Sequence, residues 1–546
     1  MGAKPPAAPV LPVVTCVPMA AAPGTTTKVM FSGEGLGKPA GLWTSFAAEA
    51  TVRDDVSGGK VGYRLKVPAE VQVGIGAVRV VSSSGASSLL FFMIDDLPTQ
   101  PRMAAKHSAS EARAMPEAGA VEGACEALAS DFYVIEGKRG RRVSIEVVAN
   151  RLGSRLDPVI RLIGPDGREV GFCDDFPGIA PDCMLAHTFE ADGKYVVEVR
   201  DVNYEGGAKY YYRMRVGDFP LVTCAFPVVG QRGTEQPQHF SFEGAAGARL
   251  DRSGIKIPQT ARRVPIGLAN PGGMGSGFAS ILGADAADFV AREPNHQINS
   301  AAGISLPVEI SGRFSVAGQK DYYAFVGNRG DRVRVRGQSR SIGSACELEV
   351  AIIGADGRKV PEPKPPVEAK KPAADAPALP TFAEEEQVEA QIPADGEYYI
   401  VARNIGAGAG TGMVYRLVVE HGPDFALAAD SDKVDVPAGG SARMKVSCVR
   451  KGFAGRIRLS LEDGTGWEAG DAFIEAGKME GEIEIKGVDG AVDKSSINLR
   501  IVGTATINDA EREHFASTAA ALQKVYPRMR FVPAELDGLI GVGMKP

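Results

Sequence analysis

The chain contains an internal duplication, and this feature limits the folds open to it more than any other. Residues 131–170 align without a gap to residues 321–360. An insertion follows, and after it residues 191–200 match residues 394–403. The matched pairs include Asp131 with Asp321, Tyr133 with Tyr323, Gly140 with Gly330, and Tyr212 with Tyr415. The unit is far longer than the 20–50 residues of a solenoid repeat, so the sequence predicts two copies of one domain.

Polar and apolar residues alternate within each copy, which predicts strands with one buried face. In the first copy the alternating residues are Val143, Ile145 and Val147 against Arg142, Ser144 and Glu146. Pro165-Asp166-Gly167 and Asp192-Gly193 supply turn residues between such segments. Short strands separated by regular turns are typical of sandwiches, so we predict an all-β fold built as a multidomain array of β-sandwiches.

A second, shorter repeat precedes each copy. The paired segments are 12–16 with 220–224, 29–35 with 239–244, and, more weakly, 73–96 with 266–289. We call the shorter modules A and A′ and the longer ones B and B′, so that the chain has the order A-B-A′-B′.

Beyond B′, alternation of Ile457, Leu459 and Leu461 with polar residues predicts one further sandwich. In the tail, Ala510, Phe515, Ala519 and Leu522 have helical spacing and predict a helix over residues 509–526. A length of 546 residues is enough for four or five domains. The expected boundaries are 9–98 for A, 99–115 for a connector, 116–217 for B, 218–292 for A′, 300–420 for B′ with a proline-rich insertion at 361–380, 424–507 for the final module, and 508–546 for the tail.

Charge and hydropathy exclude two classes of partner. The net charge is −6, so no basic field is present to hold nucleic acid. The sequence contains no stretch of about 18 apolar residues, so no membrane span is predicted. The first residues lack a basic region followed by an apolar one, so they are not a secretory signal as they stand. We nevertheless favour an extracellular, cell-surface or periplasmic location, because the modules that follow look extracellular.

The chain has seven cysteines, an odd number that leaves at least one thiol unpaired within the chain. Cys173 and Cys183 flank a short loop rich in Pro, Asp and Gly, and we predict a disulfide between them. The alternative is a pair of reduced thiols in a loop. No C-x-x-C pair or neighbouring histidine indicates zinc.

Several segments of module B carry a family resemblance. They are Asp131-Phe132-Tyr133, Leu156-Asp157-Pro158, the turn IGPDGR, Cys173-Asp174-Asp175, and ADGKYVVEVRD followed by Tyr210-Tyr211-Tyr212-Arg213. Module B resembles the bacterial pre-peptidase C-terminal (PPC) domain, and B′ does so more weakly. A and A′ look like IPT/TIG immunoglobulin-like modules, and the final module resembles an Ig-like domain in strand layout. The resemblance implies jelly-roll-like accessory modules of secreted proteins, some of which bind calcium or extracellular polymers and are not themselves enzymes.

The acidic loop of module B is the best candidate site. Asp174, Asp175 and Asp182 lie within nine residues of one another, and Asp157 lies at the start of a neighbouring predicted strand. Calcium takes six to eight hard oxygen ligands, which clustered carboxylates can supply. The alternative is a solvated loop whose aspartates cap turns. B′ has Pro- and Lys-rich sequence in place of the Asp pair, so calcium is expected in B only.

Residues that could carry other functions have simpler structural interpretations. None of the six histidines lies in a catalytic motif, and His187 is expected to be a packed or edge residue. Arg329-Gly330-Asp331 falls at a predicted turn. Trp43 and Trp467 could stack on sugars but are expected in cores.

The sequence therefore predicts a non-catalytic exported structural or adhesive protein whose modules act as spacers and as protein- or glycan-contacting surfaces. The alternative is a calcium-dependent polysaccharide- or protein-binding accessory protein of a secreted hydrolase system. An enzyme with its site at a module interface is a third hypothesis, which convergent Ser, His and Asp in an exposed cleft would support.

Overall fold

The structure is a computed structural model in which strands joined by short turns make up most of the chain. It describes residues 13–34, 36, 39–53, 59–101, 107–244, 247–362, 386–462, 466–487, 498–529 and 531–545. Strands account for about 56% of the residues and helices for 4%, which confirms the predicted all-β class. In these ranges no helix is long and apolar enough to cross a membrane. Most of the predicted insertion at 361–380 lies outside the described residues.

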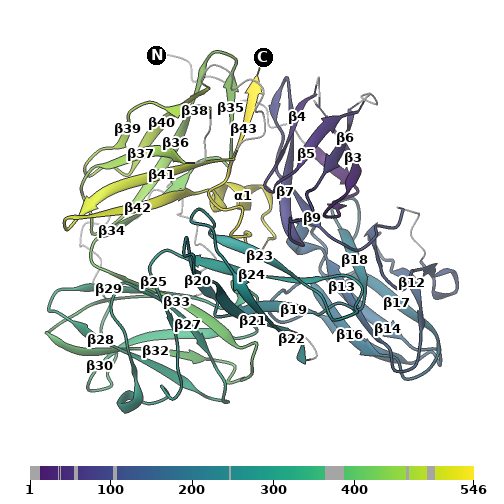
Figure 1. The fold of residues 1–546 in the computed structure, drawn as a ribbon, viewed down its shortest axis with the longest axis horizontal. Helices are drawn as coiled ribbons and strands as arrows, with labels where there is room; N and C mark the ends of the chain where they lie inside the picture. The colour runs from purple at the N-terminus through teal and green to yellow at the C-terminus, as the bar shows by residue number, and fades with distance from the viewer. Residues whose placement is uncertain are drawn as a thin grey trace. The chain divides into compact units, whose positions relative to one another are not determined.

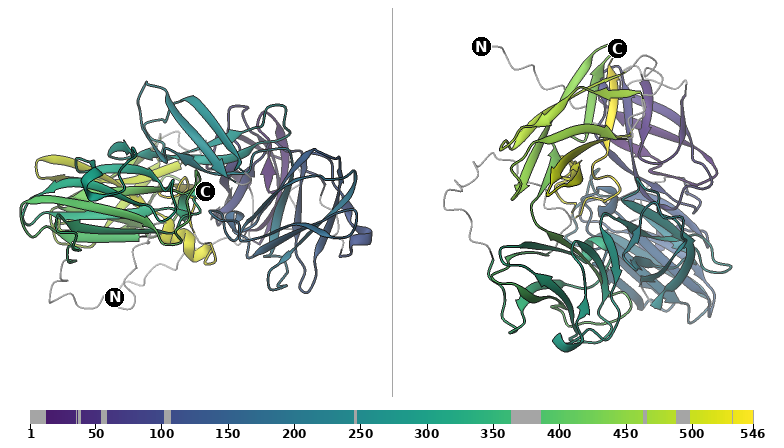
Figure 2. Two further views of the ribbon diagram at one scale, coloured as in Figure 1. Left: turned by 90° about the horizontal axis from the view of Figure 1, so that it is seen from below. Right: turned by 60° about the vertical axis from the view of Figure 1, so that its left-hand side comes forward.

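The chain divides into two compact units. One unit contains Leu97–Pro423, and the other joins Met1–Asp96 to Asp424–Pro546. Figures 1 and 2 show that each module is built of packed strands. Modules B, A′ and B′ therefore form one unit, and A shares the other with the last module.

Module B is a sandwich of two sheets. Its first sheet has the order β10 (Arg113–Ala114), β12 (Asp131–Gly137), β17 (Gly193–Asp201), β14 (Pro158–Ile163), β15 (Glu169–Asp174). Its second sheet has the order β11 (Gly119–Ala124), β18 (Tyr211–Gly217), β13 (Arg142–Val148), β16 (Cys183–Thr188). The core between the sheets contains Val143, Ile145 and Val147, as the alternation predicts.

Module B′ repeats most of this topology, with one strand added to its second sheet and no counterpart of β15 among the described residues, so the sequence repeat is also a structural one. Its first sheet has the order β26 (Ala302–Gly303), β28 (Lys320–Gly327), β32 (Gly396–Asn404), β30 (Leu348–Gly354). Its second sheet has the order β25 (Ala287–Val290), β27 (Val308–Arg313), β33 (Val414–His421), β29 (Arg332–Gln338), β31 (Glu386–Gln391). β25 pairs with β27, so residues 287–290, which we expected in A′, belong to a sheet of B′.

Module A′ consists of two three-stranded sheets. They are β19 (Val222–Phe226), β21 (Gln238–Gly244), β22 (Arg249–Ile255), and β20 (Val229–Gln231), β24 (Gly277–Ala284), β23 (Arg263–Leu268). Phe240 and Phe242 of β21 lie in the core between them.

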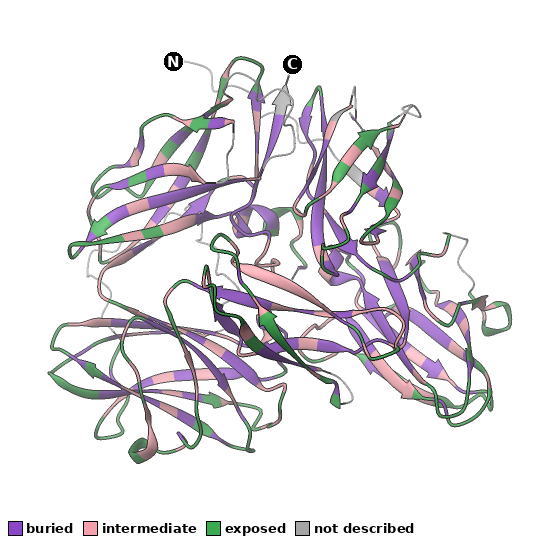
Figure 3. Cartoon of the chain, viewed as in Figure 1, coloured by how far each residue is buried: buried purple, intermediate pink, exposed green. Residues whose placement is uncertain are grey.

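The expectation that β13 buries only one face is wrong. Ser144 and Glu146 point away from the core of B, yet both are buried. Figure 3 shows that buried residues run along the strands, whereas exposed residues are frequent in the turns and loops. The reason is that A′ packs on this outer face. Ser144 Oγ donates a 2.6 Å hydrogen bond to the carbonyl of Phe219, and Arg215 donates one of 2.6 Å to the carbonyl of Ser276. Glu146 forms a 2.5 Å ion pair with Arg215, so the buried charges of these two residues compensate each other.

Module A has two sheets like A′, with more strands. They are β1 (Val13–Val17), β3 (Thr26–Gly33), β6 (Lys60–Lys66), β5 (Glu49–Val52), and β2 (Ala20–Ala21), β9 (Leu90–Ile94), β7 (Gly74–Ser82), β4 (Pro39–Thr44) with β8 (Gly85–Ala86) on β7. In both A and A′ the short strand after the first one pairs in parallel with the last long strand, β2 with β9 and β20 with β24.

The last module, which we call C, covers residues 424–545. Its strands are β34 (Asp424–Ala429), β35 (Lys433–Pro437), β36 (Ser441–Lys451), β37 (Ile457–Glu462), β38 (Trp467–Ala469), β39 (Ala472–Ile474), β40 (Glu480–Gly487), β41 (Asn498–Ile507), β42 (Ala510–Ser517) and β43 (Ile540–Lys545). The tail expected at 508–546 is therefore part of this module, because β42 and β43 both pair with β41.

The helix expected over residues 509–526 is wrong for its first half. Residues 510–517 form β42, and the helix α1 is only Ala519–Val525. Asn508 and Asp509 both have positive φ, 51° and 61°, so they form a two-residue turn that folds β42 back on β41. Asn and Asp tolerate this conformation, and such turns match the twist of a hairpin. Hairpin pairing thus prevails over the helical spacing of the apolar residues.

Modules A and C are joined by buried polar contacts within their unit. Arg79 of β7 forms an ion pair with Asp432, and its guanidinium also donates a 2.8 Å bond to the carbonyl of Ser87. Asp435 of β35 accepts a 2.7 Å bond from the amide of Ala86 in β8. Tyr526, just after α1, packs edge-on against Phe91 of β9.

Candidate cation site

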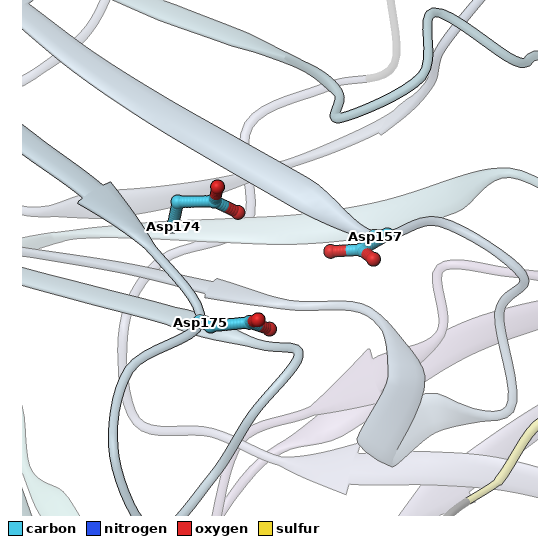
Figure 4. Close-up of side chains that lie close together, drawn as sticks. All are labelled: Asp157, Asp174 and Asp175. Carbon is cyan, nitrogen blue, oxygen red and sulfur yellow. The ribbon is translucent and has the colours of Figure 1, made fainter.

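Three of the four aspartates predicted to bind calcium come together in module B. Asp157 directly precedes β14, Asp174 ends β15, and Asp175 follows it, so antiparallel pairing of β14 with β15 brings them to one edge. One carboxylate oxygen from each lies within 4.8 Å of those of the other two. Figure 4 shows the three carboxylates facing a common space. This spacing suits oxygen ligands of one cation.

The neighbouring carboxylates act on the pKa of Asp157. Asp157 is partly buried, whereas Asp174 and Asp175 are exposed. Burial, followed by the charges of Asp175 and Asp174, raises the pKa of Asp157 to about 6. Its Oδ1 is buried and accepts no hydrogen bond from any residue that the structure describes. A cation among the three would relieve both the repulsion and the missing contact.

Asp182, the fourth predicted ligand, does not join this group. Its carboxylate is fully buried and accepts hydrogen bonds of 3.0 and 2.7 Å from the amides of Ala149 and Asn150. Arg151 adds an ion pair of 2.6 Å. Asp182 therefore holds the turn after β13 and lies outside the group of three converging carboxylates.

Cys173 and Cys183 are neighbours, as predicted, but the structure has both as free thiols. Cys173 lies on β15 and Cys183 on β16, in opposite sheets of module B. The Cys183 thiol donates a 2.7 Å hydrogen bond to the carbonyl oxygen of Pro158. It also lies 3.4 Å from the carbonyl oxygen of Cys173. The remaining five cysteines are also buried: Cys16, Cys125, Cys224, Cys346 and Cys448.

Module B′ keeps the scaffold of the site without its acidic pair. Glu347 is the counterpart of Asp157, and its amide donates to Asn404 at 2.9 Å as that of Asp157 donates to Asp201 at 3.1 Å. The sequence that replaces Asp174 and Asp175 is rich in Pro and Lys and falls largely in 363–385, outside the described residues.

Five of the six histidines face carboxylates. The pairs are His107 with Asp131 and Glu126, His239 with Asp251, His296 with Asp321, His421 with Asp331, and His514 with Asp424. His187, in β16, instead packs between the rings of Phe189 and Tyr195, in line with the predicted packed role. Burial lowers the pKa of His187.

Sequence reasoning missed one set of converging polar residues on module A′. His239 Nδ1 lies 2.7 Å from the hydroxyl of Ser253, and His239 Nε2 lies 3.7 Å from Asp251. In a working Ser-His-Asp triad the aspartate is buried and hydrogen-bonded to the imidazole. Here the His239 and Asp251 side chains are 61% and 52% exposed, and 3.7 Å exceeds a hydrogen bond. We interpret the set as cross-strand contacts on β21 and β22.

Other sequence candidates occupy structural positions. Gly330 has φ 93° in a turn closed by a 3.0 Å bond from the amide of Asp331 to the carbonyl of Asn328. The Arg329-Gly330-Asp331 tripeptide thus serves a turn. Trp43 and Trp467 are buried, so neither offers a face to a sugar.

Comparisons with known proteins identify no family. No protein-family model matches the chain, and no curated protein matches it. Among solved structures, it is similar at 8% identity to SGBP-B of the Bacteroides ovatus mixed-linkage glucan utilization locus, in complex with a mixed-linkage heptasaccharide, with 74% of this chain and 73% of that one covered and a TM-score of 0.12. A mutant Salmonella alpha-2-macroglobulin gives 10% identity, 89% and 28% coverage and a TM-score of 0.12. The N-terminal four Ig domains of Dscam1 give 10% identity, 91% and 95% coverage and a TM-score of 0.15.

Proposed function

We propose that the protein is a non-catalytic, exported structural or adhesive protein whose module B binds calcium through Asp157, Asp174 and Asp175. The observation that supports the cation is the convergence of these three carboxylates, one of them with a raised pKa. The chemistry that calcium would supply is neutralisation of their charge and a rigid link between β14 and β15.

The spacer role is supported by the contacts between modules inside the unit 97–423. A′ packs on B through Phe219, as described above, and on B′ through Ser311, whose hydroxyl accepts bonds of 3.0 and 3.2 Å from the amides of Val228 and Val229. Modules held by buried hydrogen bonds keep their loops at fixed separations. Such a protein suits contact with an extracellular protein or polysaccharide.

The relation of B and B′ to PPC domains, and of A and A′ to IPT/TIG modules, is also part of the proposal. This relation predicts that calcium-binding PPC domains hold their cation at the position of Asp157, Asp174 and Asp175. An experimental structure of the protein crystallised with calcium would test this relation together with the site.

Isothermal titration of calcium into the chelator-treated protein tests the cation directly. We expect one site per chain, lost in the variant Asp174→Asn/Asp175→Asn and kept in Asp166→Asn. Asp166 is a matched control because it is an exposed aspartate of module B that caps the turn at Arg168. Absence of heat from the unmodified protein removes calcium from the proposal.

A further inference from the structure

Cys173 and Cys183 lie next to the strand ends that carry the three carboxylates. Cys173 precedes Asp174 on β15, and the Cys183 thiol donates to the carbonyl of Pro158, the neighbour of Asp157. Both cysteines belong to the core between the two sheets. The pair therefore touches the backbone of both strands that carry the site.

The Cys183 thiol also lies 3.4 Å from the backbone carbonyl oxygen of Cys173, which places the two cysteines side by side across the two sheets. Cys173 is 8% exposed and Cys183 is fully buried. Cys173 is thus the thiol that an oxidant meets first, and Cys183 is placed to resolve the product.

We propose that Cys173 and Cys183 form a reversible disulfide that links the two sheets of module B and tightens cation binding at Asp157, Asp174 and Asp175. This inference rests on the proposed calcium site. It concerns the regulation of that site.

The oxidant in this proposal is a small-molecule disulfide. The Cys173 thiolate attacks one of its sulfurs, which forms a mixed disulfide and releases one small thiolate. The Cys183 thiolate then attacks the Cys173 sulfur and displaces the second small thiolate. Two protein thiols thereby lose two protons and two electrons, and the small disulfide is reduced to two thiols.

The link would act on the site through the loop that it closes. Asp174 and Asp175 lie between Cys173 and Cys183, so a disulfide restricts the conformations of both carboxylates before the cation arrives. A site restricted in advance loses less entropy when it binds. Linkage makes the effect reciprocal, so calcium must favour the disulfide by the same factor.

The test uses the full chain in two redox states. Protein equilibrated with oxidised glutathione and protein kept in a reducing phosphine are each titrated with calcium, after mass spectrometry of alkylated peptides assigns the Cys173–Cys183 bond. We expect the calcium Kd to fall roughly fivefold on oxidation, the lower end of couplings between sites. The equilibrium constant for disulfide formation against glutathione should rise by the same factor in saturating calcium.

The variant Cys173→Ser/Cys183→Ser should bind calcium with the affinity of the reduced protein and show no response to glutathione, whereas Cys448→Ser in module C should respond like the unmodified chain. Equal calcium affinities in the two states, or no Cys173–Cys183 bond after oxidation, would overturn the inference while leaving the site intact. Absence of calcium binding in both states would instead overturn the proposed function. The comparison of redox states needs no variant, so it holds even where the serine variant does not fold.

Discussion

Tyr212 donates a 2.6 Å hydrogen bond to the buried carboxylate of Asp131 from the opposite sheet of module B. The hydroxyl of Tyr133 lies 2.6 Å from that of Tyr212 and extends the network. Module B′ repeats it with Asp321, Tyr323 and Tyr415. The duplicated residues that first reveal the repeat in the sequence are thus the ones that tie the two sheets of each copy together. Gly123 faces the ring of Tyr212 and Gly312 faces that of Tyr415, and a side chain at either glycine would collide with the ring.

The first prediction concerns this network. Tyr212→Phe leaves the buried Asp131 carboxylate without its donor, and we expect a loss of about 1–3 kcal/mol in the free energy of unfolding. Urea unfolding of the full chain measures it. Tyr204→Phe is the control, because Tyr204 is exposed and the change should stay within about 0.5 kcal/mol. Equal effects of the two substitutions would contradict a structural role for the network.

The second prediction is a pH dependence set by Asp157. Its pKa is about 6 in the folded protein, above the ordinary 3.8, because of burial and the charges of Asp175 and Asp174. As the pH rises, Asp157 therefore loses its proton at a lower pH in the unfolded chain than in the folded protein. The stability that the group contributes is complete below about pH 4 and is lost as the pH approaches 6.

Urea unfolding in chelator at pH 4 and pH 7 tests this sign. Asp157→Asn should gain stability relative to the unmodified chain at pH 7 but not at pH 4, by less than about 1 kcal/mol because partial exposure screens the charges. With saturating calcium the dependence should reverse, since the cation binds the deprotonated form. A variant that is equally stable relative to the parent at both pH values would refute the shift.

The third prediction concerns the contact between modules A and C. Asp432→Ala leaves the guanidinium of Arg79 buried without its carboxylate, and we expect a loss of about 3–5 kcal/mol. The double change Arg79→Met/Asp432→Leu should recover much of it, since an apolar pair avoids the cost of burying charge. Lys66→Ala is the control, because its ion pair with Glu49 is exposed. Thermal unfolding of the full chain gives the comparison.

The fourth prediction concerns Ser253, His239 and Asp251. Their exposure and the long contact between His239 and Asp251 predict that Ser253 is no stronger a nucleophile than an ordinary serine. A fluorophosphonate probe should therefore not label the protein. Labelling that disappears in Ser253→Ala but survives in Ser84→Ala would establish a reactive serine and revive the enzyme hypothesis.

Local patterns were enough to predict most of the strands and the duplication. Alternation such as Val143, Ile145 and Val147 reports directly on which side chains enter a core. The pattern could not reveal that the polar residues between them are buried as well, because that depends on A′ packing against the outer face. For the same reason Asp182 looked like a ligand, although its partner Arg151 lies 31 residues away in the sequence.

The association of modules A and C was also beyond sequence reasoning. Arg79 and Asp432 are 353 residues apart, and neither stands in a pattern that indicates a partner. The β42 hairpin, in contrast, had a readable signal. Asn and Asp both tolerate positive φ, so Asn508-Asp509 indicates a two-residue turn directly before residues 510–517.

The junction of A with C has a mechanical consequence. The polypeptide leaves their shared unit after residue 96 and returns to it at residue 424. Residues 97–423 are therefore inserted between two segments of the same unit. Tension between β1 and β43 would load the contacts between A and C, which include the Arg79–Asp432 ion pair, before it loads the sheets of modules B, A′ and B′. Loss of these contacts would lengthen the connection between β1 and β43 by the span of those three modules.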